Sequence, residues 1–205
     1  LQIPDSSKIK ETKLKIGSGK LIVKNGNLQK TNRQLQIDLS AIAKGWGVDK
    51  LAKYLIQKGF NNFMVEIGGE IVVSGLNKDN QLWQIGILNP DGLHSDLYST
   101  IEVSNKAVAT SGIYQNYFTL EGIDYSHLIN PITGYPVKHD LISATIVADD
   151  CATADAVATA VMVKGFERGL KWINSLTGIE CFLIKEVDGG YYTGYSDGFN
   201  YLPIE

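Results

Sequence analysis

Residues 38–75 read DLSAIAKGWGVDKLAKYLIQKGFNNFMVEIGGEIVVSG, and this stretch decides the fold class. From Ser40 to Lys58 apolar residues recur mostly every three or four positions, which predicts an amphipathic helix that starts near Asp38–Ser40 and ends at Gly59. The runs NFMVEIGG and EIVVSG then follow as two short β-rich segments bounded by glycines. A helix set apart from adjoining strands favours an α+β fold over a parallel α/β sheet.

The remainder of the chain continues this pattern. Asn25-Gly26 lies between two short alternating runs and predicts a hairpin, and RQLQIDL is expected to form a strand ahead of the helix. The runs LWQIGIL, STIEVS, KAVATSG and YQNYFTLEGIDYSHLI extend an antiparallel meander. Residues 151–164 and 166–176 predict two further helices, and ECFLIKEVDGGYYTG predicts a closing hairpin. We therefore expect one α+β domain over residues 1–205, with antiparallel strands and segregated helices.

Composition narrows the range of partners. The 205 residues are 44% hydrophobic and 20% charged, with a formal net charge of -3, so no overall basic field would attract nucleic acid. Cys151 and Cys181 belong to no CxxC or Cys/His metal spacing, which leaves two buried thiols and one disulfide as open alternatives. The opening LQIPDSSKIKETK resembles neither a signal peptide nor a membrane span, and we expect a processed or truncated start.

Asp155 and Thr159 lie four residues apart in ATADAVATA, so a helix would present both from one face with only Ala or Val between them. A carboxylate and a hydroxyl are hard oxygen donors, and Mg²⁺ binds a few protein oxygens together with waters and substrate phosphates. The alternative is structural. Asp155 would then complement the helix dipole in the first turn, and Thr159 would bond back to a carbonyl.

The segment DLSAIAKG, residues 38–45, runs from an expected strand end into a helix start. Its small residues let the backbone approach a ligand closely, and the first N–H groups of a helix favour an anion. Lys44 could neutralise a phosphate there. The segment is neither a Walker A loop nor a GxGxxG fingerprint. In the structural alternative, Asp38 or Ser40 is the N-cap and Lys44 is solvated.

Three further motifs contain candidate residues. Glu66-Ile-Gly-Gly-Glu70 has paired glycines at a strand end, which indicates a bulge or a closely approaching ligand. His127 lies on an expected strand ahead of an Asn-Pro turn, and histidine can move a proton near neutral pH, although a structural role is the alternative. Residues 109–114, ATSGIY, are expected to form a hydroxyl-rich loop with an aromatic ring that stacks or packs.

Taken in order, DLSAIAKG, VEIGGE, ATSGxYxxYF, SHLINPxTG and ATADAVATA resemble the ApbE family of FAD:protein FMN transferases. The resemblance covers nearly all of the chain from the NGN hairpin onward and corresponds to roughly the carboxy-terminal two-thirds of a family member. The amino-terminal part, with its Met-Gly-Thr motif, has no counterpart. The resemblance implies a T-fold-like antiparallel β-sheet that binds FAD and Mg²⁺, cleaves the pyrophosphate and moves FMN to a threonine hydroxyl of an acceptor protein, releasing AMP.

The same resemblance implies a metal site. Asp155 and Thr159 match the family's metal-binding side chains, and the backbone carbonyl of Ala41 matches a third ligand. One position departs from the family pattern, because Ile113 stands where the family usually has Asp in SGDY. Any polar contact made by that Asp is missing in this chain.

The resemblance also implies flavin contacts. Asp38 and Lys44 match positions that contact FAD, and His127 and Ile129 lie beside it. His127 is the candidate base for the acceptor hydroxyl, because an alcohol is a poor nucleophile until a proton is drawn from it.

By resemblance, the acceptor is a flavoprotein subunit that carries a Ser/Thr-Gly-Ala-Ser/Thr motif, which this chain itself does not contain. Family members usually act outside the cytoplasm through a lipid anchor, so we expect an extracytoplasmic location and an anchor that lies outside this sequence. Two alternatives stay open. One is a pyrophosphatase that splits FAD into FMN and AMP, and the other is a non-catalytic flavin-binding module.

Overall fold

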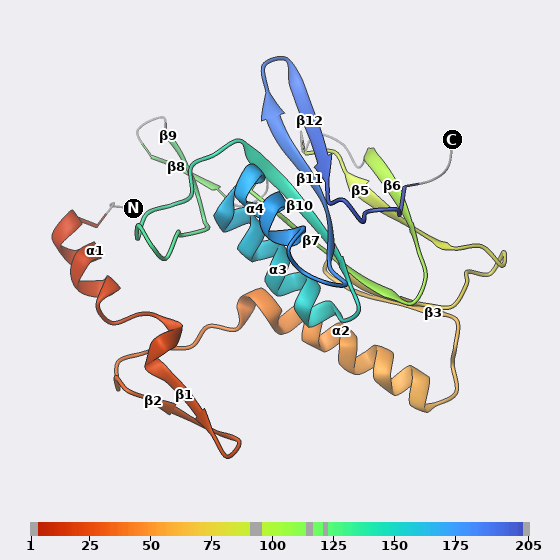
Figure 1. Ribbon diagram of the computed structural model, residues 1–205, viewed down its shortest axis with the longest axis horizontal. Coiled ribbons are helices and arrows are strands. Elements are labelled where there is room, and N and C mark those ends of the chain that lie inside the picture. Colours follow the sequence, from red (N-terminus) through yellow and green to blue (C-terminus); the bar gives the residue numbers. More distant parts are fainter. Residues whose placement is uncertain (1–3, 91–95, 114–116, 121–122, 203–205) are drawn as a thin grey trace. The chain divides into compact units, whose positions relative to one another are not determined.

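The computed structural model describes residues 4–90, 96–113, 117–120 and 123–202 (Figure 1). The chain divides into two compact units. Unit 1 comprises residues 1–38 and 117–138, and unit 2 comprises residues 39–116 and 139–205. The expectation of a single domain over residues 1–205 stays a prediction.

Unit 2 is built on a six-stranded antiparallel sheet with the strand order β12-β11-β10-β7-β4-β3. Its strands are β3 (Phe63–Ile67), β4 (Glu70–Ser74), β7 (Lys106–Gly112), β10 (Leu141–Ala148), β11 (Glu180–Val187) and β12 (Gly190–Tyr195). The inner strand β10 is buried at all of its positions except the half-buried second one. A strand with this burial has both faces of the sheet covered.

Three helices of unit 2 contact the sheet: α2 (Ser40–Gln57), α3 (Cys151–Lys164) and α4 (Phe166–Ile173) (Figure 1). Helix α2 contacts β3 and β4, α3 contacts β4, β7 and β10, and α4 contacts β11. Ser111 on β7 points to the helix side, because its hydroxyl lies 3.3 Å from that of Thr159 on α3. Since side chains alternate along a strand, Val108 points to the opposite face.

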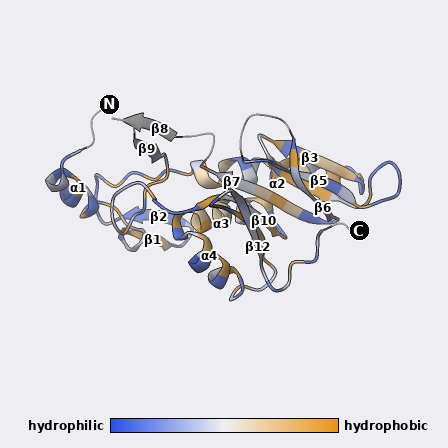
Figure 2. Ribbon diagram, turned by 90° about the horizontal axis from the view of Figure 1, so that it is seen from above, coloured by the Kyte–Doolittle hydropathy of each residue, from blue (hydrophilic) through white to orange (hydrophobic). Residues whose placement is uncertain are grey.

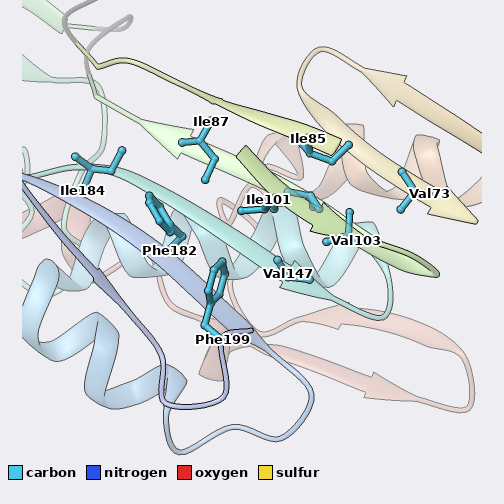
Figure 3. Close-up of a cluster of buried hydrophobic side chains, with 10 residues drawn as sticks. Val73, Ile85, Ile87, Ile101, Val103, Val147, Phe182, Ile184 and Phe199 are labelled. Carbon is cyan, nitrogen blue, oxygen red and sulfur yellow. The ribbon is translucent and has the colours of Figure 1, made fainter. Parts of the chain in front are cut away.

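That opposite face is covered by the hairpin of β5 (Trp83–Leu88) and β6 (Leu97–Val103), which forms its own two-stranded sheet. Buried side chains from the hairpin, the sheet and the C-terminal segment meet there in one hydrophobic cluster, as Figure 3 shows. The cluster consists of Val73, Ile85, Ile87, Ile101, Val103, Val108, Val147, Phe182, Ile184 and Phe199. The core of unit 2 is therefore on the hairpin side as well as beneath the helices.

Unit 1 contains α1 (Ser6–Lys13), a short 3₁₀ helix (Ser18–Lys20), the hairpin of β1 (Leu21–Lys24) and β2 (Asn27–Lys30), and the hairpin of β8 (Tyr117–Leu120) and β9 (Ile123–Ser126). Helix α1 is exposed or half-buried along its length and largely hydrophilic (Figure 2). Asn25 and Gly26, with φ values of 51° and 72°, form the turn between β1 and β2. The predicted Asn-Gly hairpin is thus confirmed.

Most of the predicted elements are present, but three expectations are wrong. RQLQIDL is not a strand, because residues 35–39 are irregular and lead directly into α2. The meander is interrupted, since β4 pairs with β7 while β5 and β6 pair only with each other among the described strands. Residues 106–112 form strand β7, so ATSG is not a loop, and Tyr114 lies outside the described residues. Strand β10 and helix α1 have no counterpart among the predicted elements.

Within the described part of the chain, no helix is both long and apolar enough to cross a membrane. Cys151 and Cys181 are both free and buried, which resolves the alternatives in favour of thiols. Burial raises the pKa of each thiol to about 12, so both stay protonated at neutral pH.

Helices α2 and α3 approach each other closely at Gly45. A Cβ atom at this position would lie 2.3 Å from the carbonyl oxygen of Cys151, a distance that the backbone of α3 would have to relieve by moving. Gly47 in the same helix is different, because a Cβ there would lie 3.4 Å from Cδ1 of Ile67. The crossing of the two helices therefore requires glycine at position 45 but not at position 47.

We expect Gly45→Ala to destabilise the protein by about 1–3 kcal/mol, because overpacking the crossing forces backbone shifts. Gly47→Ala is the matched control and should be neutral or stabilising by about 0.5–1 kcal/mol, since alanine is the better helix former. Urea unfolding followed by circular dichroism measures both changes. Equal free energies of unfolding for the two variants would contradict the close crossing.

Candidate functional site

The candidate site is built around the first turns of α2. The structure puts Leu39 at the N-cap position, and its apolar side chain cannot accept a hydrogen bond. The structural alternative in which Asp38 or Ser40 is the N-cap is therefore wrong. Ala41 and Gly45 follow one turn apart, and Gly45 is buried against the backbone of Cys151 and Ala152 at the start of α3.

Asp155 of α3 meets α2 at this end. Its Oδ2 atom accepts a hydrogen bond of 3.1 Å from the N–H of Gly45, and the side chain is buried. In an α-helix the N–H of residue 45 is directed at the carbonyl of Ala41, four residues earlier. The carboxylate of Asp155 therefore lies beside the Ala41 carbonyl, which brings two oxygens of the predicted metal site together.

Asp155 does not lie in the first turn of α3, as the structural alternative had it, and other carboxylates cap that end of the helix. Oδ1 and Oδ2 of Asp49 accept from the N–H groups of Cys151 and Ala152 at 2.8 and 2.9 Å. Asp150 is the N-cap and accepts from the N–H of Thr153 at 2.8 Å. Because the N–H groups of Cys151, Ala152 and Thr153 already have carboxylate acceptors, Asp155 is not needed to cap the start of α3.

Thr159 lies one turn beyond Asp155 on α3 and is half-buried. Its Oγ1 atom is 3.3 Å from Oγ of Ser111, and either hydroxyl can be the donor. The hydroxyl therefore contacts strand β7 rather than bonding back to its own helix. Ser111 was indicated in the sequence only as part of the hydroxyl-rich run, because the pairing of β7 with α3 is a long-range feature.

Lys44 forms an ion pair that the sequence motifs do not reveal. Its Nζ atom lies 2.6 Å from Oε2 of Glu70 on β4, and it also donates to the carbonyl of Gly68 at 3.3 Å. Glu70 is buried whereas the Lys44 side chain is 47% exposed. Burial raises the pKa of the Glu70 carboxyl, and the Lys44 ammonium opposes that rise.

The other predicted site residues belong to unit 1. His127 directly follows β9 and is exposed, and Ile129 is 49% exposed and forms an isolated bridge with Pro136. The N–H of Val137 donates to the carbonyl of Leu128 at 2.9 Å. Two extended stretches are thereby held side by side, with His127 and Ile129 on the first.

An Asn-Pro turn closes these two stretches. The side-chain oxygen of Asn130 accepts a hydrogen bond from the N–H of Ile132 at 2.8 Å. The backbone carbonyl of Asn130 accepts one from the N–H of Gly134 at 2.7 Å. Gly134 has a φ of 82°, which favours glycine. The turn predicted from the motif is therefore present. Asp38 lies in the irregular segment of residues 35–39 ahead of α2 and is exposed.

The structure thus gathers four of the predicted residues on the helix side of the unit 2 sheet, namely Ala41, Lys44, Asp155 and Thr159. Among the described residues, no group of three or more His, Cys, Asp or Glu side chains could hold a metal ion. The predicted set is of another kind, with one carboxylate, one hydroxyl and one carbonyl. These donors fit Mg²⁺, which takes its remaining ligands from water and phosphate.

A groove of about 420 Å³ lies on the other side of the sheet. It is lined by residues of β3, β5 and the Gly68-Gly69 turn, and the hydroxyls of Thr110 and Thr145 lie in its wall, 2.8 Å apart. Thr110 and Ser111 are neighbours on β7 and therefore point to opposite faces. The groove is thus separated by the sheet from Asp155 and Thr159.

Fold and site together define an α+β protein with an oxygen-donor site where the start of one helix crosses another helix on an antiparallel sheet. The chain matches the ApbE family over residues 1–183. It belongs to the ApbE family, and the resemblance carried by the five motifs is confirmed.

Named relatives agree with this assignment. The FAD:protein FMN transferase of Vibrio cholerae is 40% identical over 197 residues, covering 96% of this chain and 59% of the relative. The FAD:protein FMN transferase of Escherichia coli K12 is 32% identical over 203 residues, covering 97% of this chain and 58% of the relative. The chain therefore spans about three fifths of the length of these relatives.

Solved structures confirm the fold. The flavin transferase ApbE from Vibrio cholerae matches with a TM-score of 0.86 at 38% identity, covering 97% of this chain and 62% of that one. The ApbE protein from Thermotoga maritima matches with a TM-score of 0.83 at 30% identity, covering 96% and 63%. The predicted α+β class with antiparallel strands is confirmed by these matches and by the strand pairing of unit 2.

Proposed function

We propose that this chain supplies the metal-binding and flavin-contacting part of a Mg²⁺-dependent enzyme that transfers FMN from FAD to a threonine hydroxyl of an acceptor protein and releases AMP. One observation carries the proposal. The buried carboxylate of Asp155 lies beside the Ala41 carbonyl at the start of α2, in a chain that belongs to the ApbE family. Relatives with the name FAD:protein FMN transferase support the reaction class.

The chemistry is a phosphoryl-type displacement. The threonine oxygen forms a bond to the phosphorus of the FMN half, and the bond from that phosphorus to the bridging oxygen breaks, so AMP leaves with the bridging oxygen. The threonine proton passes to a base. Such a reaction asks the protein mainly to position the groups and to stabilise charge. When bound, Mg²⁺ would neutralise charge on the pyrophosphate.

Different residues of unit 2 would bind the cation and the pyrophosphate. Asp155, Thr159 and the Ala41 carbonyl would hold the cation, since they are hard oxygen donors from the start of α2 and one face of α3. Lys44 would attract the negative oxygens of the pyrophosphate, because its ammonium lies at the exposed rim of the same helix end. The carboxylate would also keep the N–H of Gly45 paired whether or not a ligand is present.

In unit 1, Asp38, His127 and Ile129 would contact the flavin nucleotide, a role supported by their match to the family pattern. His127 would accept the threonine proton. It is exposed and lies between β9 and the turn at Asn130, and both give the backbone on either side of it a fixed path. An exposed imidazole on a fixed backbone suits proton transfer near neutral pH.

The acceptor would be a flavoprotein subunit with a Ser/Thr-Gly-Ala-Ser/Thr motif. The enzyme would act outside the cytoplasm and would be held at a membrane by a lipid anchor. The resemblance to the family supports these three proposals, and the motif would place the reactive hydroxyl among small residues, where a bulky flavin nucleotide can approach it.

Incubation of the chain with FAD, Mg²⁺ and an acceptor protein bearing the motif should give covalent flavin fluorescence on the acceptor after denaturing electrophoresis. AMP should appear in equal amount, and chelation of Mg²⁺ should abolish both. An acceptor with alanine in place of the reactive threonine is the control. Release of FMN and AMP without labelled acceptor would contradict the transferase and identify a pyrophosphatase.

Asp155→Asn should lower the transfer rate by about 100-fold, because loss of one anionic ligand removes several kcal/mol of charge stabilisation supplied through the metal. The asparagine carbonyl can still accept from Gly45, so the fold should be kept. Asp150→Asn is the matched control on the same helix and should change the rate by no more than about twofold, since asparagine caps as well as aspartate. An unchanged Mg²⁺ dependence in Asp155→Asn would refute the metal assignment.

His127→Gln should lower the transfer rate by about 100- to 10,000-fold if the imidazole accepts the threonine proton. The variant should keep its affinity for FAD within a few-fold, since glutamine can replace a hydrogen bond but not the base. Rapid-quench kinetics and flavin fluorescence titration measure the two quantities. A loss confined to FAD affinity, with the transfer rate at saturating FAD unchanged, would show that His127 binds the substrate and is not the base.

A further inference from the structure

The Lys44–Glu70 pair departs from an ordinary surface ion pair. The Glu70 side chain is 3% exposed, and its Oε2 atom lies 2.6 Å from Nζ of Lys44. Burying a charged carboxylate is unfavourable unless it is paired, and Lys44 is the cation that pairs with Glu70. The lysine itself is 47% exposed and does not need the glutamate for its own solvation.

The ammonium of Lys44 is held at two points on one hairpin. Glu70 is the first residue of β4, and Gly68, whose carbonyl accepts from Lys44 at 3.3 Å, lies in the turn between β3 and β4. An ammonium has three N–H donors. The Gly68 carbonyl engages one of them. Oε2 of Glu70 is buried and accepts no hydrogen bond of good geometry, so it holds the ammonium chiefly by charge, and the half-exposed lysine keeps donors for a ligand.

Glu70 also lies near the predicted metal ligand. The negative charge of Asp155 acts on Glu70 and, like burial, raises the pKa of that carboxyl. Lys44 therefore lies in a region with two buried carboxylates, Asp155 and Glu70, and one of them pairs with it directly. The two carboxylates have different partners, because Glu70 pairs with the lysine while Asp155 accepts a hydrogen bond from the N–H of Gly45.

We propose that Glu70 is a positioning residue that, with the Gly68 carbonyl, fixes the Lys44 ammonium at the start of α2 so that one of its remaining N–H groups is presented to a pyrophosphate oxygen. This inference rests on the proposed function and deepens it by assigning a residue that contacts no substrate. A lysine side chain has four rotatable bonds, and fixing it before the ligand arrives removes an entropic cost from binding.

The test uses inorganic pyrophosphate with Mg²⁺ as the probe and isothermal titration calorimetry on the full chain. Glu70→Gln and Lys44→Met should each weaken pyrophosphate binding by about tenfold, the usual effect of losing a charge-assisted hydrogen bond. The double variant should bind no more weakly than Lys44→Met alone, because Glu70 acts only through the lysine. Losses that multiply in the double variant would overturn the proposal, as would a wild-type chain that does not bind pyrophosphate.

A second comparison separates charge from packing. Glu70→Asp keeps the charge but leaves a small gap, whereas Glu70→Gln keeps the shape but loses the charge. If Glu70 positions the lysine, Glu70→Asp should bind pyrophosphate more tightly than Glu70→Gln. The reverse order would mean that Glu70 merely fills space. Glu66→Gln is the matched control, since Glu66 is exposed on the same hairpin, and its affinity should equal that of the wild type.

Transfer assays on the same samples distinguish this inference from the proposed function. Glu70→Gln should raise the KM for FAD by about tenfold and change kcat less, because the lysine contacts a group present in both substrate and transition state. A wild-type chain that shows the coupled pyrophosphate binding but labels no acceptor would refute the transferase and leave the role of Glu70 intact. Active transfer with an unchanged KM in Glu70→Gln would refute the role of Glu70 alone.

Discussion

The site of unit 2 depends on one close approach, the crossing of α2 and α3 at Gly45. With no Cβ at this position, the backbone of α2 can lie against Cys151, and the N–H of Gly45 then reaches the Asp155 carboxylate at 3.1 Å. The same contact places that carboxylate beside the Ala41 carbonyl. Asp49 of α2 strengthens the contact between the two helices, because it accepts hydrogen bonds from two N–H groups at the start of α3. The absence of a side chain at Gly45 thus determines both the packing of the two helices and the position of the Asp155 carboxylate.

The charges around this crossing impose a cost on the stability of the fold. Two carboxylates, Asp155 and Glu70, are buried close enough to influence one another, and such groups lower the stability of a fold unless they are compensated. Lys44 compensates one of them directly. The other accepts a single backbone hydrogen bond and keeps capacity for a cation. This cost is consistent with the roles proposed for the two carboxylates in binding a cation and in positioning Lys44.

The sequence predicts local features of this structure better than long-range ones. The α2 helix, the Asn-Gly hairpin and the closing β11–β12 hairpin follow from periodicity and turn residues within one segment. RQLQIDL has the alternation of a strand, yet residues 35–39 are irregular, since alternation cannot show whether a partner strand is available. The pairing of Lys44 with Glu70 spans two elements, and only the packing of α2 on β4 reveals it. Five motifs in family order indicated the site residues, whereas spacing alone left the structural alternatives open.

The two faces of the sheet explain why the site lies on the helix side. Ala107 and Ala109 share the helix-facing side of β7 with Ser111, and such small side chains allow α3 to lie close enough for Thr159 to reach the Ser111 hydroxyl at 3.3 Å. The opposite face carries Val108 and other branched side chains that meet the β5–β6 hairpin in a cluster. Bulky residues there supply the hydrophobic stabilisation. The helix side can therefore use small and polar residues, and it is there that Asp155, Thr159 and the Ala41 carbonyl, the proposed metal ligands, are found.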